Sequence, residues 1–417
     1  MHNTKKTAVP LFGFLLFGVL FSLACNKDTP ISGNTDLINR DELGNVLQSS
    51  ITARMDSTAG KAINTAGSSF LFLGSYKDVE SRVLLRFDPL PDSGTVVAAR
   101  LRLPAEEATG QTGSFDATVH QVTTPWKTSE VVWGENDFPV QFNPAMDTRQ
   151  IVATVADTTD TIAFNLNPQV VTRWFSSLSV SNRDTNGVLL QASNAAFIKA
   201  FPSRSNSLRQ LFLEVTTRTR IANRDTTITA RRSATASVFV FKRLAPLPAQ
   251  RLHVGNGESL QSVLSFDLRK FIPDTIPKSA TISRATLSLQ FDAANSVFVD
   301  SDDILSLTLY VDLRKFGLDT LKSVDFFQAP LDSLLFFQSI AAGISNTSSQ
   351  FDITGLVQRW VALPPEERTP PQSYGYFYLV PDFPALLLSR AAFYTRENSE
   401  PLAPKLKIEY TTPPKTR

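Results

Sequence analysis

The sequence predicts an all-β protein: two tandem antiparallel β-sandwich domains of the jelly-roll type, each with a short helix, behind an N-terminal signal segment. Three observations predict this fold. The apolar segments are short, rich in β-branched residues and separated by Gly, Pro, Asn and Asp, which is typical of sandwiches and barrels. Several segments alternate apolar and polar residues, as strands with one buried face do. Four segments recur in the same order in the two halves of the chain.

The N-terminal segment, residues 1–24, has the order of a secretory signal: a positively charged start, an apolar run, and a small residue before the cleavage point. Its end, "SLAC", resembles the lipobox of bacterial lipoproteins, in which the cysteine is acylated and becomes the new N-terminus. Ser22 departs from the branched apolar residue that is usual at its position. The resemblance implies signal cleavage between Ala24 and Cys25 and lipidation of Cys25. A transmembrane anchor and an ordinary cleaved signal are the alternatives.

Residues 25–46 are polar, contain Pro and Gly and lack aromatic residues, so we expect a flexible tether. About 20 such residues reach roughly 25 Å. Asn26 follows the cysteine, where an aspartate would favour inner-membrane retention by analogy with enteric lipoproteins. The expected location is therefore outside the cytoplasm, on the outer membrane or cell surface, with the membrane as partner through the lipid anchor.

Composition excludes several classes of function. The 417 residues include 41 basic and 39 acidic residues, so the net charge of +2 gives no electrostatic footprint for nucleic acid. Cys25 is the only cysteine, which leaves no partner for an intramolecular disulfide. The sequence has no HExxH, CxxC, GxxxxGK[ST] or GxGxxG motif. We therefore expect no cofactor, no metal and no enzymatic activity.

The individual strands follow from alternation. Side chains of successive strand residues point to opposite faces, so the "ARLRL" segment at 99–103 places Leu on one face and Arg on the other. Alternating segments occupy residues 82–88, 95–103, 211–217, 285–292, 305–313 and 406–412.

An internal repeat sets the domain organisation. The paired segments are 84–88 with 263–267, 95–103 with 281–289, 164–174 with 351–360, and 208–215 with 403–410. Their shared order predicts homologous domains at 47–218 and 221–413. Before Trp174 and Trp360, apolar residues at i, i+1 and i+4 predict a short helix whose tryptophan packs in the core.

The first domain resembles the DNRLRE-domain family of secreted bacterial and archaeal β-sandwich modules, some of which are classed as carbohydrate-binding. The resemblance rests on "LLRFDPLP", "ARLRL", "TPWKTSEVVWGENDFP" at 124–139, "NGVLLQAS" and the closing "FPSRSNSLRQLFLEV". The second domain matches more loosely and lacks the element with two tryptophans. The resemblance implies a β-sandwich that binds extracellular material.

Candidate site residues are few. Trp126 and Trp133 are the candidates for ligand binding, because sugar rings stack on flat apolar faces, and core packing is the alternative. His120 and His253 lie in no recognisable catalytic context, and we expect them on strand surfaces. The acidic clusters are interpreted as solvated loops, although a carboxylate pair or a calcium site stays open; they are Glu106, Glu107, Glu130, Glu135 and Asp300 to Asp303.

The sequence leaves three functions open. The first is a non-catalytic, lipid-anchored envelope protein that binds or organises extracellular material, for which polysaccharide is the favoured ligand. The second is a structural or adhesive spacer whose domains contact cell-envelope proteins. The third is an enzyme with an unrecognised carboxylate site. An exposed aromatic strip in the first domain would favour the first function, and polar faces with an interdomain groove would favour the second.

Overall fold

A computed structural model describes residues 46–87, 94–104, 114–133, 137–143, 151–156, 161–174, 186–205, 210–267, 276–298, 304–312, 334–343, 347–362, 374–382 and 388–413. These residues form mostly antiparallel β-sheet, which confirms the predicted all-β class. The signal segment, Cys25 and nearly all of the expected tether lie outside the described residues.

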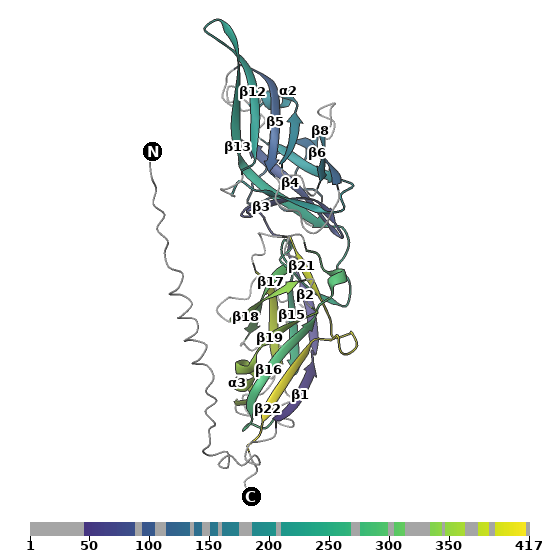
Figure 1. Ribbon diagram of the computed structural model, residues 1–417. Coiled ribbons are helices and arrows are strands. Elements are labelled where there is room, and N and C mark those ends of the chain that lie inside the picture. Colours follow the sequence, from purple (N-terminus) through teal and green to yellow (C-terminus); the bar gives the residue numbers. More distant parts are fainter. Residues whose placement is uncertain are drawn as a thin grey trace, which may run out of the picture.

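The strands pair into two bodies that follow one another along the molecule (Figure 1). The first body comprises one continuous curled sheet with helix α2 (Pro168–Thr172). Its strands are β3 (Phe70–Tyr76), β4 (Val79–Phe87), β5 (Thr95–Pro104), β6 (Ser114–Val122), β7 (Phe142–Asn143), β8 (Ile151–Ala156), β9 (Thr161–Leu166), β10 (Val188–Ser193), β11 (Ile198–Pro202), β12 (Phe212–Ile221) and β13 (Arg224–Arg243).

The second body contains the remaining strands, with helix α3 (Thr354–Ala362) and the 3-10 turn η2 (Ala293–Asn295). Its main sheets have the orders β1-β22-β16-β19 and β18-β17-β20-β15-β2, and β14 pairs with β21. The strands are β1 (Val46–Thr52), β2 (Met55–Ala59), β14 (Arg251–Gly255), β15 (Gln261–Asp267), β16 (Thr281–Gln290), β17 (Ile304–Asp312), β18 (Leu334–Gly343), β19 (Ser348–Asp352), β20 (Tyr374–Pro381), β21 (Arg390–Tyr394) and β22 (Lys405–Thr411).

The repeated sequence segments occupy equivalent positions in the two bodies. Strand β5 lies between β12 and β9, and β16 lies between β22 and β19, so the repeat is reproduced in strand order. Each body also has the short helix expected before its tryptophan, α2 and α3. Trp174 is buried and stacks on Phe87 with ring centroids 6.0 Å apart, and the half-buried Trp360 contacts Phe377.

The first body packs an apolar core inside its curled sheet, and the second body packs one between its sheets. Alternate residues of the strands supply both cores, because a strand with one wet face buries every second side chain. Leu101, Phe164 and Phe239 belong to the first core, and Leu287 and Phe351 belong to the second. Burial of such side chains contributes roughly 1.5–3 kcal/mol each.

Strand pairing crosses the boundary that the sequence predicts. Residues 46–59 form β1 and β2, which pair with β22 and β15 of the second body. Residues 224–243 form β13, which pairs with β12 and β4 of the first body. The expected junction near 218–221 lies in the β12–β13 hairpin, where Ala222 and Asn223 take the positive φ angles of a tight turn. The predicted ranges 47–218 and 221–413 therefore differ from the paired bodies by the first strand of each.

Candidate functional site

The two candidate tryptophans lie in a loop that covers the outer face of the first body's sheet. We call residues 123–133 and 137–143 the Trp loop. Trp126 and Trp133 are 6% and 3% exposed, and they form one cluster with apolar side chains of β4, β10 and β13. Neither ring offers a free face to a sugar, so core packing, the alternative to ligand binding, describes their environment.

Polar contacts hold the two indole rings in place. Trp126 Nε1 donates a hydrogen bond to the Asn186 carbonyl over 2.7 Å, and Arg86 donates to the Trp126 carbonyl over 3.1 Å. Arg82 lies over the Trp133 ring at 4.4 Å and Lys242 at 4.7 Å. The negative face of an aromatic ring attracts a cation placed over it, so these contacts stabilise the position of the ring. The faces that would stack on a ligand are thus occupied by the protein itself.

Both candidate histidines are buried in strands, which corrects the expectation of surface positions. His120 lies in β6, 8% exposed, with Nε2 2.9 Å from the Thr118 hydroxyl. His253 lies in β14, 1% exposed, and burial lowers its pKa to about 4, with the positive charge of Arg390 adding to the effect. Burial, and after it the positive charge of Arg82, also lowers the pKa of His120, so both are neutral imidazoles at pH 7. Neither ring bonds a carboxylate among the contacts that the structure describes, and the Thr118 hydroxyl beside His120 donates to the Gln191 carbonyl.

The acidic candidates fall into two groups. Glu130 is exposed and pairs with Lys127 over 2.7 Å, as expected of a solvated loop. Glu106, Glu107, Glu135 and the cluster at 300–303 lie outside the described residues. Within the described part of the chain, no group of three or more His, Cys, Asp or Glu side chains is placed to hold a metal.

Sequence reasoning missed the contact between the two bodies. Arg390 of β21 donates to Asp78 over 2.8 Å, and Arg243 of β13 pairs with Glu258 over 3.5 Å. Lys77 Nζ donates to the Ser296 carbonyl. Val297 and Leu388 of the second body belong to the first body's core cluster. The bodies therefore share apolar core as well as ion pairs.

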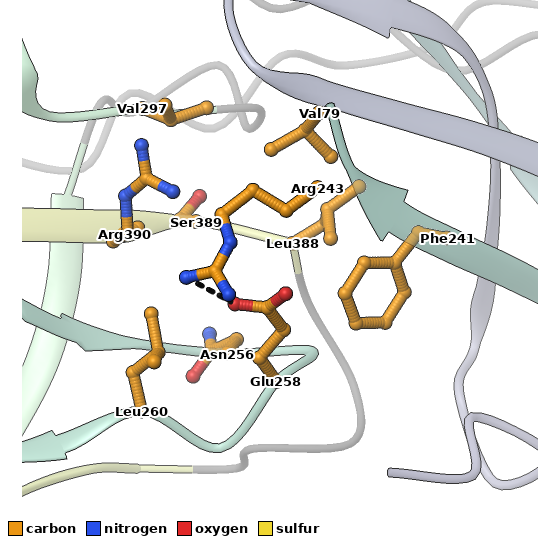
Figure 2. Close-up of a pocket in the computed structure, with 10 residues that line it drawn as sticks. All are labelled: Val79, Phe241, Arg243, Asn256, Glu258, Leu260, Val297, Leu388, Ser389 and Arg390. Atoms are coloured by element: carbon orange, nitrogen blue, oxygen red, sulfur yellow. Dashed lines mark ion pairs between the residues drawn. The ribbon is translucent and has the colours of Figure 1, made fainter. Parts of the chain in front are cut away.

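A small cavity lies inside this contact (Figure 2). Figure 2 shows the Arg243 guanidinium beside the Glu258 carboxylate, with Asn256 and Leu260 below and Arg390 opposite. The side-chain amide of Asn256 is buried and makes no hydrogen bond. The cavity volume of about 20 Å³ is the size of one water molecule. Ligand sites typically need about 300–1,000 Å³, so the cavity is too small for a sugar ring.

A larger groove, about 720 Å³, adjoins the cavity where the chain crosses between the bodies. Its charged lining residues, Arg243 and Glu258, pair with each other. The other lining residues are Thr58, Gly60, Ala62, Leu244, Ala245, Pro246, Leu247 and Leu260, and no aromatic ring is among them. The groove has the size of a ligand site but not the aromatic platform that a polysaccharide needs.

Two matching arginine sites, one in each body, hold the first strands. In the first body, the Arg204 backbone N–H donates to Ser237 Oγ over 3.0 Å, and its guanidinium donates to the Thr235 carbonyl. In the second body, the Arg396 N–H donates to Asp56 over 2.7 Å, and its guanidinium donates to the Arg54 carbonyl. Each arginine thus clamps a strand that comes from the other repeat.

Comparisons with known proteins give no family. No family model matches the chain, and no curated protein matches it. A similar solved chain, from "Structure of infectious bursal disease virus Gx strain", is 13% identical over 89% of this chain and 76% of that chain, with a TM-score of 0.13. A TM-score this low carries no argument. The resemblance to the DNRLRE-domain family stays a prediction. None of the described helices has the length and apolarity needed to cross a bilayer.

Proposed function

We propose that this chain is a non-catalytic structural spacer of the cell envelope: two interlocked β-bodies held off a membrane by a lipidated tether at Cys25. The bodies contact other envelope proteins rather than a small ligand. The Trp loop contributes stability to the first body and does not bind sugar.

The observation that carries this proposal is the placement of the aromatic side chains. Every aromatic residue whose burial the structure describes is buried or half-buried, and the exposed large apolar residues are aliphatic: Val46, Leu47, Val97, Ile221, Ile228 and Leu244. Sugar rings bind through exposed flat faces. The described residues form no exposed aromatic strip, and a groove without aromatic rings lies between the bodies, which favours the spacer over the polysaccharide-binding protein.

The shared core of the two bodies supports the same proposal. A spacer must keep its length, and bodies joined only by a flexible linker move relative to each other. Here Val297 and Leu388 reach into the other body's core, and the Arg390–Asp78 ion pair is mostly buried. This contact resists bending between the bodies.

A glycan array tests the choice between the two functions. The exported chain, without its signal, is applied at high micromolar concentration beside the variants Trp126→Ala and Trp133→Ala. The expected result is no binding by any of them. Saturable binding by the wild type that either variant abolishes would return the polysaccharide function to first place.

Metabolic labelling with a palmitate analogue tests the anchor separately. The wild type incorporates the label and Cys25→Ser does not, because the acylated sulfur is then missing. Equal labelling of both chains would reject the lipid anchor. It would not bear on the spacer function of the two bodies, which the glycan array tests.

A further inference from the structure

The first strand of each repeat pairs in the body formed by the other repeat, an exchange that the proposed function does not require. Residues 53–74 and 234–255 align without a gap, from the alanine where the strand changes sheets to Gly74 and Gly255. In this alignment β2 matches residues in the second half of β13, and the first five residues of β3 match β14. Figure 1 shows β1 and β2 in the second body, beside β22 and β15, and β13 in the first body.

The exchange is reciprocal in its contacts. Thr58 lies opposite Ser262 of β15, and Phe239, its counterpart in the alignment, lies opposite Val83 of β4. Ser262 and Val83 are themselves counterparts in the repeated "SVLSFD" and "VLLRFD" segments. The first strand of each repeat therefore pairs with the equivalent strand edge of the other repeat. The same arrangement occurs in two-fold interfaces, in which both partners use the same surface.

The connecting segments show the same reciprocity. Ile63 N–H donates to the Gly257 carbonyl over 3.3 Å, and Leu244 N–H donates to the Asp78 carbonyl over 2.6 Å. Ile63 and Leu244 are counterparts in the alignment. Both segments cross between the bodies next to the groove and the cavity described above.

The side chains at the two sites differ in chemistry. In the first body, Phe239 meets the ring of Phe72 edge-on at 5.0 Å and lies opposite the buried Val83. The site is lined by these apolar side chains of three strands, and the hydroxyl of the buried Ser81 beside them already donates to the Phe72 carbonyl over 2.7 Å. The site accepts a large ring and has no hydrogen-bond partner among these side chains for a hydroxyl.

In the second body the counterparts of those residues are polar. Thr58 Oγ1 lies 2.8 Å from Ser262 Oγ and accepts a hydrogen bond from the His253 backbone N–H over 3.0 Å. Ser262 Oγ donates to the His253 carbonyl over 2.8 Å. The hydroxyl of Thr58 completes this network, and a phenyl ring at its position would break it.

The outer faces of the two first strands differ in the same way. Val238 and Val240 of β13 pack in the cluster of the Trp loop. Their counterparts in β2 are Ser57 and Ala59, and the second repeat lacks the element with two tryptophans. The strand with the apolar outer face, β13, therefore lies in the first body, where the Trp loop covers that face.

We propose that these side chains specify the exchange: the second body is a strand-binding site selective for residues 46–59, and the first body is one selective for residues 224–243. The partner of each site is the first strand of the other repeat, supplied by the same chain. Returning each strand to its own repeat would leave a void beside Phe72 and crowd a ring against Ser262 and His253, so the two sites are not interchangeable.

Disulfide trapping tests the proposal in the full chain with Cys25→Ser, which removes the other thiol. One variant carries Thr58→Cys with Ser262→Cys, and the matched control carries Thr58→Cys with Val83→Cys. Opposite residues of antiparallel strands lie within reach of a disulfide. The expected result under mild oxidation is near-complete 58–262 linkage and no 58–83 linkage. Formation of the 58–83 disulfide, or failure of the 58–262 disulfide, overturns the proposal.

A second pair tests selectivity. Ser57 lies opposite Val263. In the chain with Ser57→Cys and Val263→Cys, adding Thr58→Phe should remove most of the linkage, whereas the conservative Thr58→Ser should retain it. Far-ultraviolet circular dichroism checks that each variant keeps its β-structure. Full linkage in the Thr58→Phe chain would show that the polar site does not select its strand and would overturn the proposal. None of these results depends on glycan or lipid.

Discussion

His253 lies in β14 under the second body's first strand, and its surroundings disfavour a charge. Burial lowers its pKa to about 4, and the positive charge of Arg390 acts in the same direction. The unfolded chain, with an ordinary histidine pKa near 6.5, binds the proton more tightly than the folded one. The stability that this histidine contributes is therefore complete above pH 6.5 and is lost as the pH falls towards 4.

Urea unfolding measured between pH 7 and 4 tests this effect. The wild type should lose about 3 kcal/mol from this group over that range, the equivalent of its pKa shift. His253→Gln, which does not titrate, should lose less, so the difference in unfolding free energy between the two chains should change with pH. A constant difference would contradict the assignment.

Asp56 presents the opposite case in the neighbouring strand. Burial raises the pKa of its carboxyl group, Glu397 adds to this, and the hydrogen bond from the Arg396 N–H only partly offsets it. The stability linked to the protonated form is present below the ordinary pKa of 3.8 and is lost as the pH rises through the folded value. At pH 7 the ionised group is thus a cost to folding.

Asp56→Asn should therefore raise the free energy of unfolding at pH 7, because the amide oxygen still accepts from Arg396 and no charge is buried. Asp56→Ala should lower it by about 1 kcal/mol, because the Arg396 N–H then loses its acceptor. Thermal unfolding of the three chains checks the order. A less stable Asp56→Asn chain would contradict the sign of the pKa shift.

At the residue scale the sequence predicted some environments and not others. Helical spacing placed Trp174 and Trp360 on a core-facing side, because that spacing is local. His120 and His253 were expected on strand surfaces, although both are buried. Alternation tells which side of a strand a residue faces, but not whether a second layer covers that side.

At the scale of elements, the Trp loop is a cover for a sheet face. Its rings pack on Leu84, Leu189 and Val238, which would otherwise face solvent. The two tryptophans singled out this segment in the sequence, and we interpreted them as candidates for ligand binding. A tryptophan packed against its own protein and a tryptophan exposed to bind a ligand cannot be told apart from the sequence.

Trp126→Ala and Trp133→Ala should each lower the free energy of unfolding by about 3–5 kcal/mol, the usual cost of removing a buried large aromatic ring. Differential scanning calorimetry of the variants measures the loss. Gln141→Ala, an exposed position in the same loop, serves as the control and should change stability little. A Trp133→Ala chain as stable as the wild type would mean that the loop does not hold the sheet.

At the scale of the whole molecule, the two halves of the sequence are interlocked. The sequence predicted the strands and the repeat, but it placed each first strand with the segments that follow it. Neighbouring strands in sequence usually pair, whereas the exchange depends on long-range contacts such as the polar network around Thr58, the apolar site around Phe239 and the two arginine clamps. Those contacts join residues far apart in the chain, so local patterns do not reveal them.

Cleavage at the β12–β13 hairpin tests this interlock. A protease site inserted between Ala222 and Asn223, at an exposed turn, divides the chain into its two repeats. The fragments should stay together in size-exclusion chromatography under native conditions, because each body contains strands from both. They should separate only in denaturant. Separation in native buffer would indicate bodies that are complete on their own.

The hairpin between β12 and β13 also bears on how such a chain can lengthen. In a reciprocal exchange two repeats supply each other's first strand. An even number of repeats can therefore fill every strand position. A third copy added by duplication would find no counterpart, and it would either keep its own strand or leave an open sheet edge, which invites aggregation. Whether the number of repeats is even or odd, and not only the length of the chain, then limits the arrays that this architecture can form.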